Sequence, residues 1–186
     1  LHPHIFEQVS MLNIEKIDTD HRSQVKRFVE LPYRLYKDCP QWVPLINIDA
    51  YTYLNRKKHP FHEHSDVDFF LAVRDGRDVG RIATIENKPF NEYHKTRKAN
   101  FYFFDCENDP EAAARLFNTV FEWAQQRNLS EVVGPKGMGP LDGYRILVFG
   151  HEHRNTMTML NYNHAYYQKL VEAQGFEKEA DFVSCY

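Results

Sequence analysis

The sequence predicts an α/β fold: one mixed, mostly antiparallel twisted sheet with a central parallel strand pair and helices on both faces. The first observation is a strand–helix–strand pattern over residues 98–135, which predicts two parallel strands joined by a helix. The second is a hairpin pattern around Asp75-Gly76, a strong two-residue turn signal. With 186 residues, the chain suits one domain over residues 1–186. Its first residue is Leu rather than Met, so we expect the native chain to be longer.

The N-terminal third predicts one strand and two helices. Residues 11–17 alternate apolar and polar side chains, as in a strand with one buried face. Thr19 or Asp20 is expected to cap the following helix, and Pro32 to interrupt it. The apolar face of this helix comprises Val25, Phe28, Val29 and Leu31. A second helix is expected over residues 46–58, where a basic run ends it.

The middle of the chain predicts the hairpin and a loop. Its strands are expected over residues 66–74 and 79–85, joined at Asp75-Gly76. Alternation along the first strand places Val67, Phe69, Leu71 and Val73 on one face. Residues 87–98 are polar and are expected to form a loop.

The strand–helix–strand unit is the organising element of the chain. Residues 100–105 form a short aromatic run typical of a buried strand. Asp109 and Pro110 are a capping residue and a first-turn proline, the usual start of a helix. The apolar face of that helix comprises Ala113, Leu116, Phe117, Val120, Phe121 and Ala124. Residues 131–135 predict the second, parallel strand.

The C-terminal part predicts a loop followed by short elements. Glycines and prolines after Pro135 indicate a shaped loop. Short strands are expected over residues 144–149 and 156–160, and a helix over residues 163–174 that Gly175 closes. Residues 176–186 are expected to form a last strand.

Composition narrows the class of protein. A net charge of −3 gives no general reason to expect nucleic acid as a partner, and no apolar run is long enough to span a bilayer. The three cysteines are scattered, with no Cys-x-x-Cys pair, which favours a reducing, cytoplasmic compartment.

Histidines form two clusters that invite a metal interpretation. One is His59, His62 and His64, and the other is His151 and His153. A catalytic zinc site needs three ligands in fixed geometry, and nothing in the sequence brings the two clusters together. Solvated loop histidines are the favoured interpretation, so no metal site is expected.

Several motifs together resemble the GNAT acyltransferase superfamily. The closing segment Asn163-His-Ala-Tyr-Tyr-Gln-Lys-Leu-Val-Glu-Ala-Gln-Gly175-Phe176 is similar to the Asn…Ala…Tyr…Gly-Phe ending of that superfamily. A closer likeness is to a group of longer, uncharacterised bacterial GNAT-like proteins. Its marks are Leu31-Pro-Tyr-Arg-Leu-Tyr36, Pro40-Gln-Trp-Val-Pro44, His59-Pro-Phe61, Val79-Gly-Arg-Ile82, Gly134-Pro135 and Tyr162-Asn163 before Tyr166-Tyr167. The resemblance implies the GNAT fold and acyl-CoA, such as acetyl-CoA, as co-substrate.

Two positions depart from the pattern of the superfamily. Where a Gly-rich loop usually cradles the CoA pyrophosphate, this chain has Cys106-Glu-Asn-Asp-Pro110. Pro110 removes an N–H donor, and Glu107 and Asp109 are expected to repel phosphate. In the last helix, Val171 stands where a tyrosine often protonates the departing thiolate. Tyr167, one turn earlier, shares its helix face.

The resemblance implies candidate site residues. Asp105 closes the core strand and Glu86 the preceding strand, and either carboxylate is a candidate base for the acceptor amine. Tyr167 is the candidate acid. The backbone edge Phe103-Phe104-Asp105-Cys106 would pair with pantetheine, with Asn108 in the adjoining loop and Asn163 orienting the ligand. The alternative roles are a plain polar strand end for Asp105, packing for Tyr167 and a buried structural thiol for Cys106.

Two functions therefore compete. The first is acyl transfer from acyl-CoA to an amine of an unknown small molecule or protein, a reaction that depends chiefly on positioning. The alternative is an inactive GNAT-like binding or interaction module that has lost tight CoA binding. The acidic loop without glycine favours the alternative, and the closing segment leaves the first open. The sequence does not specify the acceptor, the acyl chain or the oligomeric state.

Overall fold

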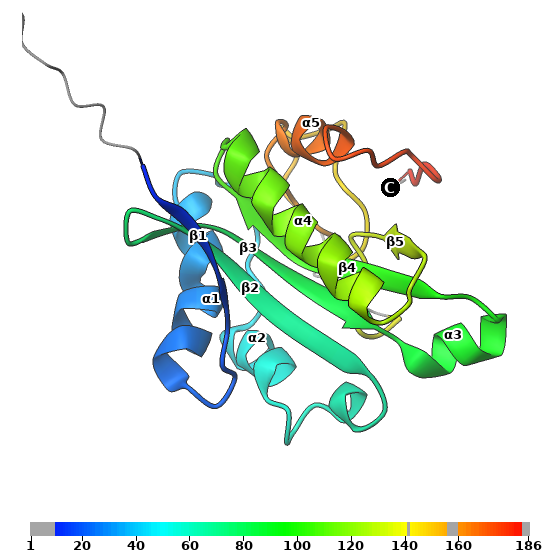
Figure 1. The fold of residues 1–186 in the computed structure, drawn as a ribbon. Coiled ribbons are helices and arrows are strands. Elements are labelled where there is room, and N and C mark those ends of the chain that lie inside the picture. Colours follow the sequence, from blue (N-terminus) through cyan, green and yellow to red (C-terminus); the bar gives the residue numbers. More distant parts are fainter. Residues whose placement is uncertain (1–9, 141, 156–159, 184–186) are drawn as a thin grey trace, which may run out of the picture.

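The computed structural model describes residues 10–140, 142–155 and 160–183 (Figure 1). In chain order the elements are β1 (Leu12–Lys16), α1 (Arg22–Leu35), α2 (Asn47–Leu54), the 3-10 turn η1 (Pro60–Glu63), β2 (Asp66–Arg74), β3 (Arg77–Glu86), α3 (Lys88–His94), β4 (Lys98–Cys106), α4 (Pro110–Gln126), β5 (Glu131–Val133) and α5 (Tyr167–Glu172). The α/β prediction is confirmed.

The strands form one five-stranded sheet in the order β1-β2-β3-β4-β5. The first three pairings are antiparallel, and β4 and β5 are parallel. The parallel strand–helix–strand unit predicted from the sequence is therefore present. It lies at one edge of the described sheet rather than at its centre, because β5 has no further strand beside it among the described residues.

Helices cover both faces of the sheet. In Figure 1, α4 crosses the near face while α1 and α2 lie behind it. The apolar face of α4 packs on one side of β4, where Phe117 contacts Phe101 and Phe104 edge-on or tilted. On the other side, Phe28 of α1 packs on Phe69 and Phe103. Two separate apolar clusters thus hold the sheet between layers of helices.

The hairpin forms as its sequence predicts. Asp75 and Gly76 have φ of 51° and 79°, which suits a two-residue turn with both central residues left-handed. The buried side chains of β2 alternate between the two clusters: Val67, Phe69, Leu71 and Val73 join one, and Phe70 and Ala72 the other. The predicted shared face is confirmed.

A bulge divides β4 into two halves. Arg81 pairs with Asp105 and Ala83 with Tyr102, so Ile82 of β3 lies opposite two residues of β4. Phe103, one of those two, has φ of 50°. As a result Tyr102 and Phe103 both face the α1 cluster, whereas Phe101 and Phe104 face α4.

The start of α4 follows its sequence signals. The Asp109 carboxylate accepts a hydrogen bond from the Ala112 N–H at 3.1 Å, and Pro110 is the first helical residue. The cap satisfies one of the unpaired N–H groups at the helix start.

Some predicted N-terminal and middle elements are wrong in detail. His21 precedes α1, without a side-chain cap, and the helix continues through Pro32 to Leu35. The second helix ends at Leu54 rather than at residue 58. The expected loop over residues 87–98 contains α3, whose first turn Asn87 caps by accepting from Phe90 N at 3.0 Å.

The C-terminal predictions are also partly wrong. Residues 144–149 form no strand, and only Tyr144 makes isolated bridges, to Lys136 and Leu160. The strand expected over residues 156–160 falls mostly outside the described residues. The last helix is shorter than expected, beginning at Tyr167, although Gly175 follows it with φ of 86°. Residues 176–183 are mostly exposed and extend without a strand partner, so the last strand is absent from the described chain.

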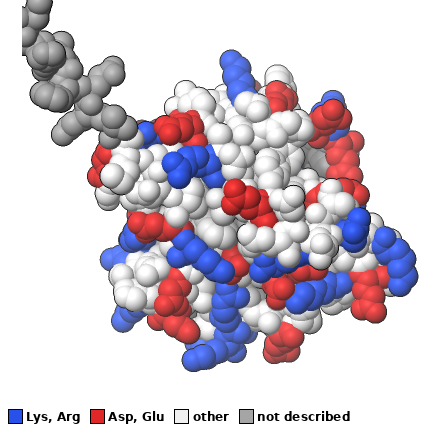
Figure 2. Space-filling view, viewed as in Figure 1, with Lys and Arg blue, Asp and Glu red and all other residues white. Residues whose placement is uncertain are grey.

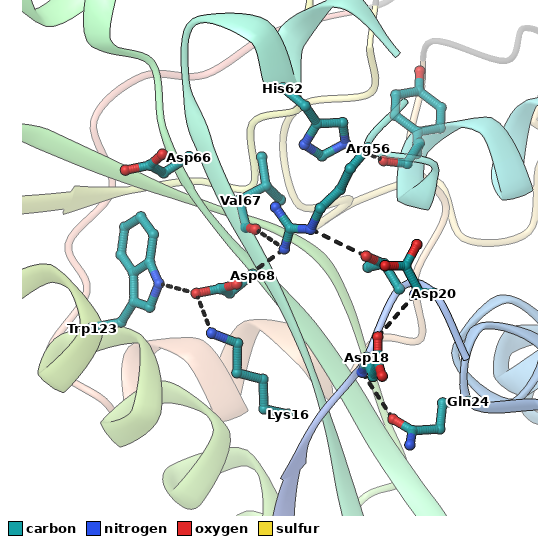
Figure 3. Close-up of polar contacts among 12 residues, drawn as sticks. Lys16, Asp18, Asp20, Gln24, Arg56, His62, Asp66, Val67, Asp68 and Trp123 are labelled. Atoms are coloured by element: carbon teal, nitrogen blue, oxygen red, sulfur yellow. Dashed lines mark hydrogen bonds and ion pairs between the residues drawn. The ribbon is translucent and has the colours of Figure 1, made fainter. Parts of the chain in front are cut away.

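A buried carboxylate ties three elements together beside the sheet (Figure 3). Asp68 of β2 accepts hydrogen bonds from Lys16 and from the Trp123 indole N–H, each at 2.8 Å, and from Arg56 at 3.1 Å. Figure 3 shows these donors arriving from β1, from α4 and from the segment after α2. Because a buried charge must be paired, this network fixes how those elements meet.

The face shown in Figure 2 carries interspersed basic and acidic side chains, as the small net charge suggests. Among the helices of the described residues, none combines the length and apolar character needed to cross a bilayer.

Candidate functional site

The parallel strands separate partway along β4. Lys98, Ala99 and Asn100 pair with residues 131–133, and the last contact is a hydrogen bond from Lys136 N to Phe101 O at 2.9 Å. The peptide bond between Gly134 and Pro135 is cis, and the chain leaves the sheet there. Residues 103–106 of β4 therefore have no β5 partner. The two strands therefore diverge after Asn100.

A cavity of about 110 Å³ lies beside this open edge. It is bounded by α1, the segment 42–45, the second half of β4, residues 145, 146 and 155, and the segment 160–163. The apolar residues of the lining, here called the apolar wall, include Phe28, Val29, Pro32, Val43, Leu45 and Phe103. The polar residues of the lining, here called the polar wall, include Arg81, Asp105, Arg145, Asn161, Asn163 and Tyr167. Since one water molecule occupies roughly 30 Å³ in the liquid, the cavity has room for a small polar head group, and the apolar side chains of the lining lie next to it.

Asp105 is the centre of the polar wall. Its Oδ2 accepts from Arg81 Nε at 2.8 Å and lies 2.7 Å from the Arg81 terminal nitrogen, in a side-on ion pair. Its Oδ1 accepts from the Tyr36 hydroxyl at 3.0 Å and from the Tyr167 hydroxyl at 3.5 Å. Arg81 also donates to Phe28 O at 2.8 Å, and its guanidinium lies 5.1 Å from the Phe28 and Phe103 ring centroids.

Tyr167 joins this network to the β4 backbone. Its hydroxyl accepts from Cys106 N at 2.9 Å and lies 3.0 Å from the Tyr36 hydroxyl. Tyr166 donates to Cys106 O at 2.8 Å. Burial, followed by the negative charge of Asp105, raises the pKa of both Tyr36 and Tyr167 well above the usual tyrosine value. Both phenols are therefore protonated at neutral pH. The hydroxyls of Tyr166 and Tyr167 occupy the backbone edge assigned to pantetheine at Cys106.

Aromatic rings pack around Tyr36 next to the cavity, and two of them, Tyr33 and Trp42, line it. The Tyr36 ring stacks between Trp42 and His164, with ring centroids 5.0 and 4.6 Å away. Tyr33 packs edge-on against Trp42 at 5.3 Å. The Leu31–Tyr36 and Pro40–Pro44 motifs thus supply the wall and cover of one site.

The acidic loop before α4 is paired with arginines. Glu107 accepts from Arg34 at 2.7 Å and from Arg77 at 2.8 and 2.7 Å. Asp109 accepts from Arg74 at 3.0 Å as well as capping α4. Arg74 also pairs with Glu111 at 2.8 Å, so three guanidinium groups balance three carboxylates at the start of α4, and the acidic loop is not an unpaired negative charge.

The remaining predicted residues differ in position. Glu86 is the last residue of β3 and lies at the opposite end of the sheet from Asp105. It is five residues, or about 17 Å, along the strand from Arg81, and it does not line the cavity. Asn163 lines it, but its amide bonds the Leu147 N–H at 2.7 Å and the Leu147 and His164 carbonyls. Asn108 is exposed in the loop. The structure brings Asp105, Tyr167 and Asn163 together, without Glu86.

The cysteine and histidine side chains considered above are held by packing and hydrogen bonds within the fold. Cys106 is fully buried against α4, and desolvation raises the pKa of its thiol, which opposes a nucleophilic role. His62 bonds the Tyr53 carbonyl at 2.9 Å and packs near His59. Among the described residues, no group of three or more His, Cys, Asp or Glu side chains could hold a metal ion.

Sequence reasoning missed Arg81, Tyr36 and Arg145 as site residues. Arg81 carried a signal, since a cation within an apolar strand must find a partner when buried. Tyr36 and Arg145 reach the site through contacts between distant segments, for which the sequence holds no local signal.

Solved structures of acetyltransferases share this architecture. A tandem GNAT protein from the clavulanic acid biosynthesis pathway matches 89% of this chain and 43% of its own, with a TM-score of 0.58 and 13% identity. The chain has the GNAT fold. A predicted acetyltransferase from Clostridium acetobutylicum, solved with acetyl-CoA, matches this GNAT fold over 95% of our chain and 96% of its own, with a TM-score of 0.56 and 15% identity.

Two curated proteins are similar in sequence to this GNAT-fold chain. "Bacterial ceramide synthase" from Caulobacter vibrioides is 31% identical over 163 residues, 87% of the chain and 42% of that protein. "Protein YghO" from Escherichia coli is 24% identical over 164 residues, 88% of the chain and 42% of that protein. The chain therefore spans less than half the length of these relatives. No protein-family model matches it.

Proposed function

We propose that this chain carries an acyl-CoA-dependent N-acyltransferase site, which moves an acyl group from the thioester to an acceptor amine. The observation that supports it best is the open edge of β4, beside a cavity that reaches both Asp105 and Tyr167. The acetyl-CoA complex of a protein with the same fold is consistent with that co-substrate. The proposal keeps the cytoplasmic location expected from the scattered cysteines.

The reaction assigns a role to each group on the polar wall. The amine nitrogen attacks the thioester carbonyl, a C–N bond forms, the C–S bond breaks, and the amine loses a proton while the CoA thiolate gains one. Tyr167 is held protonated and is the proposed donor to the thiolate. The Asp105 carboxylate is the proposed acceptor of the amine proton, directly or through Tyr36. Glu86 has no part, because it lies at the far end of β3.

Ligand entry requires a change at Cys106. Pantetheine can pair with this residue only if the Tyr166 and Tyr167 hydroxyls release its carbonyl and N–H. When pantetheine replaces Tyr167 as the partner of the Cys106 N–H, the Tyr167 hydroxyl can turn toward the bound thioester.

The acceptor is proposed to be an amine on an amphipathic, lipid-like molecule. The similar protein named a ceramide synthase suggests this class, since a ceramide is an N-acylated long-chain amine. The apolar wall formed by α1 and the segment 42–45 is suited to such a molecule, with the amine toward Asp105.

The test is release of CoA from acetyl-CoA and from a longer acyl-CoA in the presence of short and long alkyl amines. We expect amine-dependent release that falls about a hundredfold or more in Tyr167→Phe, since general acid catalysis typically contributes at least about a hundredfold. The control is Tyr93→Phe, since Tyr93 is 82% exposed on α3. Equal rates in the two variants would remove Tyr167 from the mechanism.

A binding module without catalysis is the second candidate. It is favoured by the glycine-free loop and by the occupied backbone groups of Cys106. Calorimetry with acetyl-CoA separates the two. No heat at millimolar ligand would make acyl transfer untenable for this chain and would favour the binding module.

A further inference from the structure

Arg145 is a cation in the cavity wall that the proposed acyl transfer does not use. Its guanidinium has no hydrogen-bond or ion-pair partner among the described residues, and its Nε is fully buried and unsatisfied. A buried donor without a partner costs free energy, more so when it is charged. Arg145 is half-buried, and its guanidinium is therefore available to an anionic ligand in the cavity.

The other polar groups of the wall do not share this feature. Arg81, the second cation there, is bonded to Asp105 and to Phe28 O. Asn161 donates to Arg145 O at 3.4 Å, and Asn163 bonds the Leu147 backbone. The charged groups lining the cavity are two arginines and one aspartate, so its wall carries a net charge of about +1.

The backbone at Arg145 is held in a strained conformation. Its φ is 80°, in the left-handed region that a long side chain rarely adopts. The Arg145 N–H donates to Pro135 O at 3.2 Å, and the Arg145 carbonyl accepts from Asn161. Hydrogen bonds on both sides thus keep the residue in the cavity wall.

We propose that Arg145 binds an acidic group, carboxylate or phosphate, carried by the acceptor amine itself; this inference rests on the proposed acyl transfer. Arginine presents a planar fork that suits either oxyanion. The acid neutralises the excess positive charge of the wall, and the amine of the same molecule lies toward Asp105. The phosphates of CoA are a less suitable source, since their usual place in this fold is the start of α4, where Arg34, Arg74 and Arg77 lie.

Calorimetry with three short amines tests the proposal. The probes are 2-aminooctanoate, the phosphate monoester of 2-amino-1-octanol, and octylamine, which has no acid. We expect at least one acidic amine to bind on the order of tenfold or more tighter than octylamine, which is the scale of a charge-assisted hydrogen bond. Arg145→Gln should abolish that preference, and Arg145→Lys should retain part of it.

Controls separate the site from general effects. Arg115→Gln removes an exposed cation on α4 that has no ion pair within the described chain, and it should leave all three affinities unchanged. Octylamine binding at native strength by Arg145→Gln shows that the variant is folded. In turnover, Arg145→Gln should raise KM for the acidic amine while kcat changes little.

Three results would overturn the proposal: no preference for an acidic amine, no binding of any probe, or a preference that survives Arg145→Gln. Weakened binding of CoA rather than of the amine in that variant would also overturn it and assign the anion to CoA. Arg145-dependent binding without any CoA release would support the anion site and contradict the proposed acyl transfer, so the two failures are distinguishable.

Discussion

The ion pair between Arg81 and Asp105 should behave as a buried, strongly coupled pair. Their side chains are 9% and 13% exposed, and the two shortest contacts between them are 2.7 and 2.8 Å. Removing one partner of such a pair typically costs about 3–5 kcal/mol, because the other charge stays buried without compensation. Arg81→Met keeps the side-chain length and leaves the Asp105 carboxylate with only the tyrosine hydroxyls.

Asp105→Asn should cost less than Arg81→Met. The amide still accepts from Tyr36, and Arg81 still has Phe28 O and the two aromatic rings as partners. The double variant should be more stable than the sum of the two losses predicts, with a coupling of about 1–3 kcal/mol. The buried pair then contributes chiefly by fixing β3 to the second half of β4.

Urea unfolding followed by circular dichroism measures these free energies. The control cycle uses Lys178 and Asp181, an ion pair whose side chains are 69% and 65% exposed, and it should show no resolvable coupling. The assignment of a coupled buried pair would be refuted if the losses of unfolding free energy in the two single variants simply added in the double variant. It would also be refuted if Arg81→Met unfolded at the same urea midpoint as the native protein.

Three further outcomes follow from the fold. Gly76→Val should destabilise the hairpin by about 1 kcal/mol or more, because the turn needs positive φ, while Gly76→Asn should cost less; equal melting temperatures would count against the turn. Neutralising the acidic loop in the Glu107→Gln/Asp109→Asn variant should strengthen CoA binding in calorimetry and do so less at high salt, because Arg34 and Arg77 lose their carboxylate partner and Arg74 keeps only Glu111; an unchanged affinity would exclude the loop from phosphate binding. The raised pKa values of Tyr36 and Tyr167 stabilise the fold fully below the unfolded tyrosine pKa of about 10, and this stabilisation is lost as pH rises above it. Phenolate absorbance and circular dichroism should then show the two tyrosines ionising late, together with unfolding; ionisation near pH 10 in an intact fold would contradict the network.

Local signals were enough to predict the central elements. The hairpin at Asp75-Gly76 and the cap at Asp109 depend on residues within a few positions of one another, and both formed as expected. The prediction of a loop over residues 87–98 was wrong, although the sequence carried the signals of a helix start: Asn87 caps α3 and Pro89 lies in its first turn. Overall polarity was given more weight than the capping pattern.

Long-range contacts limited what could be predicted at the site. Asp105 and Tyr167 were both identified, but the sequence could not show that Tyr36, from the end of α1, joins them. Glu86 was grouped with Asp105 because both end strands. Since β3 and β4 are antiparallel, the end of one lies beside the start of the other. The two carboxylates therefore lie at opposite ends of the strands.

The bulge at Phe103 also bears on comparisons between related chains. Strict alternation through β4 would place Asp105 with Phe101 in the α4 core, whereas two successive side chains on one face move it to the cavity. A relative that lacks one residue at position 103 would keep every other side chain of β4 on its present face and lose only the bend. A single-residue gap at that position in an alignment therefore marks chains whose β4 lacks the bulge beside the cavity.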